Sequence, residues 1–182
     1  ADQLSEIMCN INYSFLRNVN IDNILSFSTY FGFDTGNNIE KVFKIITEKR
    51  GFSPNITFEQ FYQITGVEFI VVTTCVSNKK KVDFSYKTRP NFSIIKALRI
   101  SCGLPFIFNK VCIDNEDYAD GCLKENTPIS SFTDEENIEK TIAILLSSES
   151  TKYESTWQNY TYNVILCMLE TISELQLKDY ME

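Results

Sequence analysis

The chain has 182 residues, of which 43% are hydrophobic and 13% aromatic, so it can bury one sizeable core and is expected to form a single domain. Its net charge of −7 leaves no surplus of cations for a phosphate backbone, which argues against nucleic acid as a partner. The six cysteines include no C-x-x-C pair and there is no histidine, which argues against a structural metal site. Cysteines scattered through apolar segments favour reduced thiols in an intracellular protein, and no apolar run is long enough to span a membrane.

The first part of the chain, residues 1–56, is predicted to be helical. Apolar residues three and four positions apart predict an amphipathic helix over 1–16, and a second helix is expected after a break near 17–23. A third helix carries Ile39, Val42, Phe43 and Ile46 on one face and is predicted to end at Gly51.

The next segment begins with a capping box, in which Thr57 is the N-cap and Gln60 stands three residues later, and this helix is predicted to end at Gly66. Residues 67–86 are rich in β-branched and aromatic side chains around the polar tip 78–81, which predicts a hairpin with a buried strand through 70–72.

A short helix within 91–105 follows and is predicted to stop at Gly103, before a proline. Two brief strands, 109–113 and 117–119, then lead to Asp120. The final part, 129–182, is predicted to hold a short buried strand over 140–146 and a long helix from about 153 to 177. That helix carries one apolar stripe: Trp157, Tyr160, Val164, Met168, Ile172 and Leu175.

Two features with possible surface roles favour ordinary interpretations. Lysines 79–81 are expected to form a solvated hairpin tip, with anionic lipid head groups as the alternative partner. The stripe on the last helix is expected to pack in the core, with docking on a membrane or a partner as the alternative.

The absence of histidine excludes Ser-His-Asp and Cys-His catalysis within this chain. The sequence GFDTG, residues 32–36, imitates a G-x-S-x-G nucleophile elbow with Asp34 in place of serine. We interpret it as a turn, because no buried strand is expected before it and no helix immediately after it. Asp120 and Gly121 likewise form a common turn pair when taken alone.

Residues 57–128 as a block resemble the patatin-like phospholipase family. TFEQFYQITG is similar to the end of a family helix, VEFIVVTTCVSNKKKVDFS to a strand pair, IIKALRISCGLPFIF to the A-x-R-A-S-x-x-x-P-x-x-F segment, and VCIDNEDYADGCLKENTPI to the D-G-[GA]-x-x-x-N-x-P close. The order and spacing of the four pieces match. The resemblance implies an α/β fold, the family's three-layer α/β/α hydrolase type, here a fragment without the N-terminal strands, with 57–128 as the family core.

The resemblance implies a lipid acyl hydrolase with a Ser-Asp dyad and no metal or cofactor. Asp120 matches the catalytic aspartate, and Gly121 would allow the tight turn that aims it. Arg99 and Ser101 match residues that pack behind the site. Asn126 and Pro128 match loop residues without chemistry, and Cys122 stands where the family most often has Gly or Ala. The implied partners are a lipid substrate and a membrane surface, at a cytoplasmic location peripheral to membranes.

The family's glycine-rich oxyanion loop and its serine have no match in this chain, so the nucleophile is expected about one helix length, roughly fifteen residues, before Ala1. The leading hypothesis is therefore the C-terminal part of a patatin-like enzyme. One alternative is a non-catalytic lipid- or protein-binding module that has lost its serine. Another is a two-chain enzyme whose serine lies on a separate N-terminal fragment.

Overall fold

The computed structural model describes residues 25, 27–131, 140–144 and 156–181 of the chain. The described part contains both helices and strands along its length, with parallel and antiparallel strand pairs, so the α/β class expected from the sequence is confirmed. The helix predicted over 1–16 lies outside the described residues. Of the second helix the structure describes only one turn, α3 (Phe27–Tyr30).

The larger sheet has four antiparallel strands in the order β3-β2-β6-β5. They are β2 (Val71–Cys75), β3 (Lys80–Phe84), β5 (Val111–Ile113) and β6 (Glu116–Asp120). The predicted hairpin is β2 with β3, and all five residues of β2 are buried, as expected for an interior strand. On its other side β2 pairs with β6, and Thr73 lies opposite Asp120.

A second, two-stranded parallel sheet joins β1 (Gly32–Asp34) to β4 (Phe106–Phe108). The sequence predicted neither strand. Each has only three residues, too few to show the alternation that marks a strand, and their partners lie more than 70 residues apart in the chain. Pairing between distant segments brings the segment after α6 (Ile94–Ser101) alongside the start of α4 (Asn37–Lys49).

The three central helices form as their local signals predict. Thr57 accepts from the backbone of Gln60 and donates its own N–H to the Gln60 side chain, which completes the predicted capping box of α5 (Phe58–Thr65). Gly66 has the left-handed conformation expected of a C-cap, and Gly51 has positive φ just after α4. Helix α6 covers one face of the larger sheet, so that Phe84, Ile100 and Tyr118 meet in the core.

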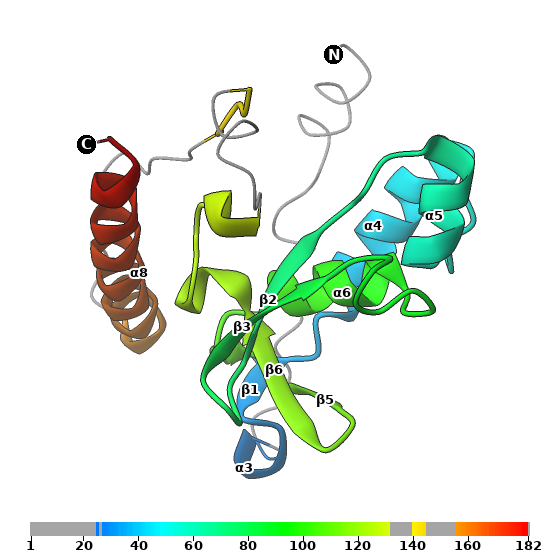
Figure 1. Cartoon of the computed structure of the whole chain (residues 1–182). Coiled ribbons are helices and arrows are strands. Elements are labelled where there is room, and N and C mark those ends of the chain that lie inside the picture. Colours follow the sequence, from blue (N-terminus) through cyan, green and yellow to red (C-terminus); the bar gives the residue numbers. More distant parts are fainter. Residues whose placement is uncertain (1–24, 26, 132–139, 145–155, 182) are drawn as a thin grey trace.

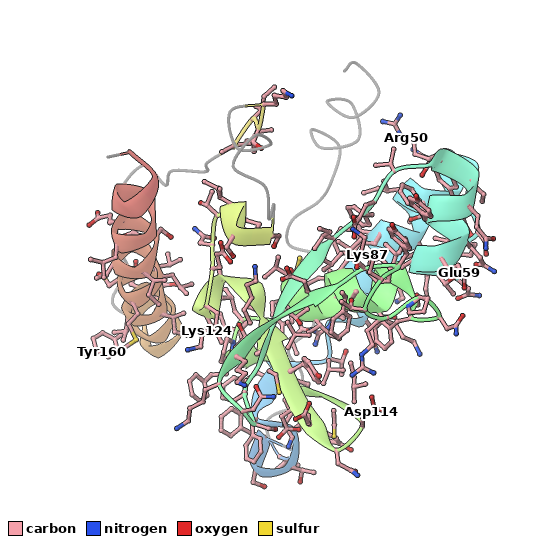
Figure 2. The ribbon with its side chains drawn as sticks, in the orientation of Figure 1. Arg50, Glu59, Lys87, Asp114, Lys124 and Tyr160 are labelled. Atoms are coloured by element: carbon pink, nitrogen blue, oxygen red, sulfur yellow. The ribbon has the colours of Figure 1, made fainter. Side chains whose placement is uncertain are left out.

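Helix α8 (Trp157–Met181) lies across the sheet from α4, α5 and α6 (Figure 1). The short turns η2 (Gly121–Leu123) and η3 (Ile129–Ser131) follow β6, and α8 contacts η2. Figure 2 shows Tyr160 projecting from α8 away from the sheet.

Two predictions about the C-terminal part were wrong where the structure describes it. Residues 141–144 of the predicted strand have no regular structure, and Ile142 and Ile144 are 89% and 85% exposed, because no described strand pairs with them. Three residues of the stripe on α8 do not pack in the core, since Tyr160, Met168 and Leu175 are all about 60% exposed. Among the side chains of α8 that the structure describes, Leu169 is buried, and the helix contacts η2.

Candidate active site

Asp120 is the last residue of β6 and the N-cap of the turn η2. Its Oδ1 accepts a hydrogen bond of 2.9 Å from the backbone N–H of Cys122. The sequence Asp-Gly thus forms a turn, as expected, and the turn holds the carboxylate of Asp120 at the end of a strand. A carboxylate fixed in this way cannot swing freely among rotamers.

Backbone contacts from two neighbouring elements frame this turn. The N–H of Asp120 donates to the carbonyl of Gly103, just beyond α6, at 3.1 Å. The carbonyl of Val72 in β2 accepts from the Ser101 hydroxyl at 2.7 Å and lies against Gly121, where a Cβ would overlap it. Gly121 has no positive φ, so the position needs glycine because of this close approach to the neighbouring strand.

Burial controls the charge of the candidate base. Asp120 is only 9% exposed, and this burial raises the pKa of its carboxyl above the ordinary aspartate value. The backbone and thiol hydrogen bonds from Cys122 lower the pKa by a smaller amount. The arrangement therefore makes Asp120 a stronger base than a solvated aspartate, which is what proton abstraction from an alcohol requires.

Cys122 contacts the candidate base directly, although the resemblance marked it only as a departure from Gly or Ala. Its backbone N–H and its thiol both donate to the Asp120 carboxylate. Burial, followed by the charge of Asp120, raises the pKa of this thiol, so Cys122 stays protonated and remains a donor.

Arg99 and Ser101 lie behind the site, in the places that the resemblance implied for structural residues. Arg99 is 3% exposed, and its guanidinium donates to the carbonyl of Thr35 at 3.1 and 2.9 Å and to that of Asn109 at 3.2 Å. It therefore ties α6 to the segments that follow β1 and β4. Burial lowers the pKa of Arg99, while the carboxylates of Glu40 and Asp34 raise it by less.

The GFDTG segment holds the short strand β1 and a turn, and α4 follows it directly, so the expectation that no helix follows immediately was wrong. The described residues just before it form α3 and not a strand, as the rejection of an elbow expected. Asp34 ends β1, and α4 starts at Asn37 because the two asparagines are its first residues. The turn itself is confirmed: the N–H of Gly36 donates to Oδ1 of Asp34 at 2.7 Å. Asp34 is 1% exposed and its turn is covered by Arg99, which leaves a structural role as the simplest interpretation.

The lysines at 79–81 do not share one environment, which corrects the prediction of a common solvated tip. Lys79 and Lys80 are exposed, but Lys81 belongs to β3 and its side chain is only 23% exposed. Its ammonium group lies 2.8 Å from Glu125. Glu125 could not be identified from the sequence, because 44 positions separate it from Lys81 and no local pattern links them.

The loop after the turn is also attached to α8. Asn126 donates its side-chain N–H to the hydroxyl of Ser173 at 2.8 Å. In Figure 2, Lys124 lies on the side of the turn nearer to α8. These contacts agree with a supporting role for Asn126 and give it no part in chemistry.

Within the described ranges no cluster of three or more cysteine, aspartate or glutamate side chains is arranged to hold a metal ion. Among the helices that the structure describes, none is both long and apolar enough to cross a membrane.

Comparisons with known proteins identify the family to which the chain belongs. A family model described as patatin-like phospholipase matches residues 1–133. The chain is 28% identical over 149 residues to "Probable lipid hydrolase 463L" of Invertebrate iridescent virus 6, covering 81% of this chain and 48% of that protein. It is also 28% identical over 158 residues to "Uncharacterized protein R571" of Acanthamoeba polyphaga mimivirus, covering 85% and 50%. The chain thus spans about half the length of the curated relatives it matches.

Proposed function

Because the chain belongs to the patatin-like phospholipase family, we propose that it forms part of a lipid acyl hydrolase in which Asp120 is the general base. The substrates are carboxylic esters of phospholipids or acylglycerols. The nucleophilic serine and the donors of the oxyanion hole lie outside this chain. A matching protein named as a probable lipid hydrolase supports the same class of reaction.

The reaction proceeds through an acyl-enzyme. The serine oxygen attacks the ester carbonyl while its proton passes to the carboxylate of Asp120, and the lipid alcohol then leaves with that proton. In the second half, Asp120 takes a proton from water, the hydroxide attacks the acyl-enzyme, and the serine regains its proton as the fatty acid is released. Neither a metal nor a cofactor takes part in these steps.

The observation that carries this proposal is the environment of the Asp120 carboxylate. It is buried at the end of a strand, burial raises its pKa, and Cys122 holds one of its oxygens in a fixed direction. An aspartate that only supported a turn could do so while exposed to water, where its ionisation has no desolvation cost. A buried carboxyl whose pKa is raised by that burial is typical of a residue kept for its basicity.

The partners we propose are a lipid substrate and a membrane surface that presents it, with the protein at the cytoplasmic face and attached only peripherally. The net charge of −7 supports the exclusion of nucleic acid.

The test is hydrolysis of a phospholipid and of a soluble short-chain ester by the intact protein that carries this sequence. Asp120→Asn keeps the acceptor for the Cys122 N–H but removes the base, so kcat should fall by about 10²–10⁴-fold. Asp117→Asn is the matched control, because Asp117 lies in the same strand, is half-buried and pairs with Lys110 at 2.6 Å. It should keep most of the activity.

Near-normal turnover by Asp120→Asn would contradict the role of Asp120. Lipid binding without any ester hydrolysis by the intact protein would favour the non-catalytic binding module. Activity that appears only when a second polypeptide is present would favour the two-chain enzyme, and mass spectrometry of the active sample would identify that fragment.

A further inference from the structure

A network of short polar contacts joins β3 to the segment that follows Asp120. The ammonium nitrogen of Lys81 lies 2.8 Å from Oε2 of Glu125 and 3.3 Å from Oδ2 of Asp83. The same nitrogen donates to the hydroxyl groups of Ser130 at 2.8 Å and Ser131 at 2.9 Å. An ammonium group has three protons, so these four acceptors use its whole donor capacity.

Glu125 connects this contact with Lys81 to Ser130 and to the turn after Asp120. Its Oε1 accepts from the N–H of Ser130 at 3.0 Å, and its Oε2 accepts from the Ser130 hydroxyl at 2.6 Å. Its own N–H donates to the carbonyl of Gly121, the residue after Asp120, at 3.0 Å. The Glu125 side chain is 9% exposed, so its charge is largely removed from water.

The turn that carries Asp120 is therefore held at both ends by the same sheet. At its start, Asp120 lies opposite Thr73 of β2. At its end, Glu125 is held by Lys81, and Lys81 lies opposite Thr74 of β2 within the hairpin. A displacement of Glu125 would pull on the Gly121 carbonyl, one residue from the carboxylate of Asp120.

Burial alone would raise the pKa of Glu125, but its contacts with Lys81 and Ser130 outweigh that effect and lower the pKa overall. Without Lys81 the carboxylate would be buried without its cation. It would then move towards water or take up a proton, and either change would weaken its bonds to Ser130.

We propose that Lys81 is a positioning residue of the reaction, which acts through Glu125 to fix the turn that carries Asp120. This inference rests on the proposed function of Asp120. It assigns a role to Lys81 that differs from the head-group contact considered for the lysine tip. A lysine whose ammonium group is already bound to four protein oxygens has no proton left for a lipid phosphate.

The experiment measures kcat and KM of the intact protein on a soluble ester, p-nitrophenyl butyrate, at a temperature well below unfolding. Lys81→Met should lower kcat by about 10–100-fold, since a displacement of about 1 Å at a catalytic group costs up to about 10²-fold. KM should change by less than about twofold. Lys80→Met is the matched control, because Lys80 is exposed in the same strand, and it should match the parent.

Two further variants separate positioning from a loss of folding. Glu125→Gln preserves the shape and the acceptor oxygen, and we expect kcat to fall by about 3–10-fold with cooperative unfolding intact. The double variant with Lys81→Met and Glu125→Gln removes both charges, so it should be more active than Lys81→Met alone. A purely structural role would lower the unfolding temperature of the single variants without this recovery of kcat.

Several results would overturn the inference. Full kcat in both Lys81→Met and Glu125→Gln, with Asp120→Asn inactive, would reject Lys81 while the proposed function stands. Full activity of Asp120→Asn would instead reject the proposed function. A loss confined to anionic phospholipid vesicles, with the soluble ester unaffected, would show that Lys81 contacts lipid. If Lys81→Met fails to unfold cooperatively, an unchanged kcat in Glu125→Gln would be sufficient to reject the inference.

Discussion

Two turns in this protein have nearly the same local chemistry but different electrostatic surroundings. Asp34 ends β1 and Asp120 ends β6, and each carboxylate accepts from the backbone N–H two residues later, at 2.7 and 2.9 Å. Both residues are buried, at 1% and 9% exposure. Arg99 packs on the turn of Asp34, whereas the hydrogen bonds that act on the pKa of Asp120 come from Cys122.

The comparison shows what distinguishes a structural aspartate from a candidate base. In the first turn a buried guanidinium accompanies the carboxylate, so the pair supports the attachment of α6 to β1. In the second turn burial raises the pKa of the carboxyl, and the energetic cost of ionising Asp120 remains in the folded protein. Reactivity therefore depends on which charges surround the turn and not on the turn itself.

The largest expected effect is on stability when Arg99 is removed. Arg99→Met leaves the carbonyls of Thr35 and Asn109 without this donor and removes a buried guanidinium near the carboxylate of Asp34, so the free energy of unfolding should fall by about 3–5 kcal/mol. Denaturant unfolding measures this change. Arg89→Met is the control, since Arg89 pairs with the exposed Asp114 and should cost about 1 kcal/mol or less.

If the free energy of unfolding falls by a similar amount in both arginine variants, Arg99 stabilises the turn at Asp34 no more than an exposed arginine would. The contrast between the turns at Asp34 and Asp120 would then fail.

The next largest effects on stability are expected when two glycines are substituted. Gly36 has φ of 74° and lies against the Arg99 guanidinium, so Gly36→Ala should cost about 2–4 kcal/mol through backbone strain and overlap together. Gly121 has no positive φ but lies against the Val72 carbonyl, so Gly121→Ala should cost about 1–3 kcal/mol through overlap alone. Only Gly121→Ala should also lower kcat, because it displaces Asp120.

Thermal unfolding with activity measured on the same samples checks both glycines. Gly51→Ala provides a reference for strain alone, because Gly51 has φ of 80° with open space around it. If Gly36→Ala lowers kcat as strongly as Gly121→Ala, the first turn also serves catalysis.

Replacement of each aspartate by asparagine should change stability in opposite directions. At pH 7, Asp34→Asn removes a charge that favours Arg99 and should cost about 1–3 kcal/mol. Asp120→Asn removes a carboxylate whose ionisation burial disfavours, and it should stabilise the protein by about 0.5–2 kcal/mol.

The sign of the pH dependence follows from the raised pKa of Asp120. Between the ordinary aspartate pKa and the raised one, the folded state binds the proton more strongly, so the contribution of Asp120 to stability is lost as the pH rises through that window. The stabilisation by Asp120→Asn should therefore disappear at pH values below the ordinary aspartate pKa. A stabilisation that is constant with pH would contradict the assigned cause.

The smallest effect concerns Cys122. Its two hydrogen bonds lower the pKa of Asp120, and Cys122→Ala removes the thiol bond but keeps the backbone one. The ascending limb of kcat/KM against pH should move to higher pH, while kcat on its plateau changes by less than about twofold. A shift to lower pH would show that the thiol does not donate to the carboxylate in solution.

Much of the local structure could be predicted from the sequence, because the interactions involved span only a few residues. The Thr57 and Gln60 capping box, the glycine that ends α5, and the hairpin around the lysines all depend on neighbours within one turn or one strand pair. The position of Asp120 at a turn is local in the same sense. Its assignment as a catalytic candidate came from the family resemblance, which the match over residues 1–133 supports at the level of the family.

The sequence by itself determined where strands and helices with clear periodicity form, and it identified the turn at Asp120. Tertiary structure alone decided that β1 pairs with β4, that Tyr160, Met168 and Leu175 of α8 are exposed, and that Lys81 reaches Glu125. These features depend on segments that are distant in the chain, so no local pattern records them. The burial that raises the pKa of Asp120 has the same origin, because Asp120 is held between distant segments: it pairs with Thr73 of β2 and its N–H donates to the carbonyl of Gly103.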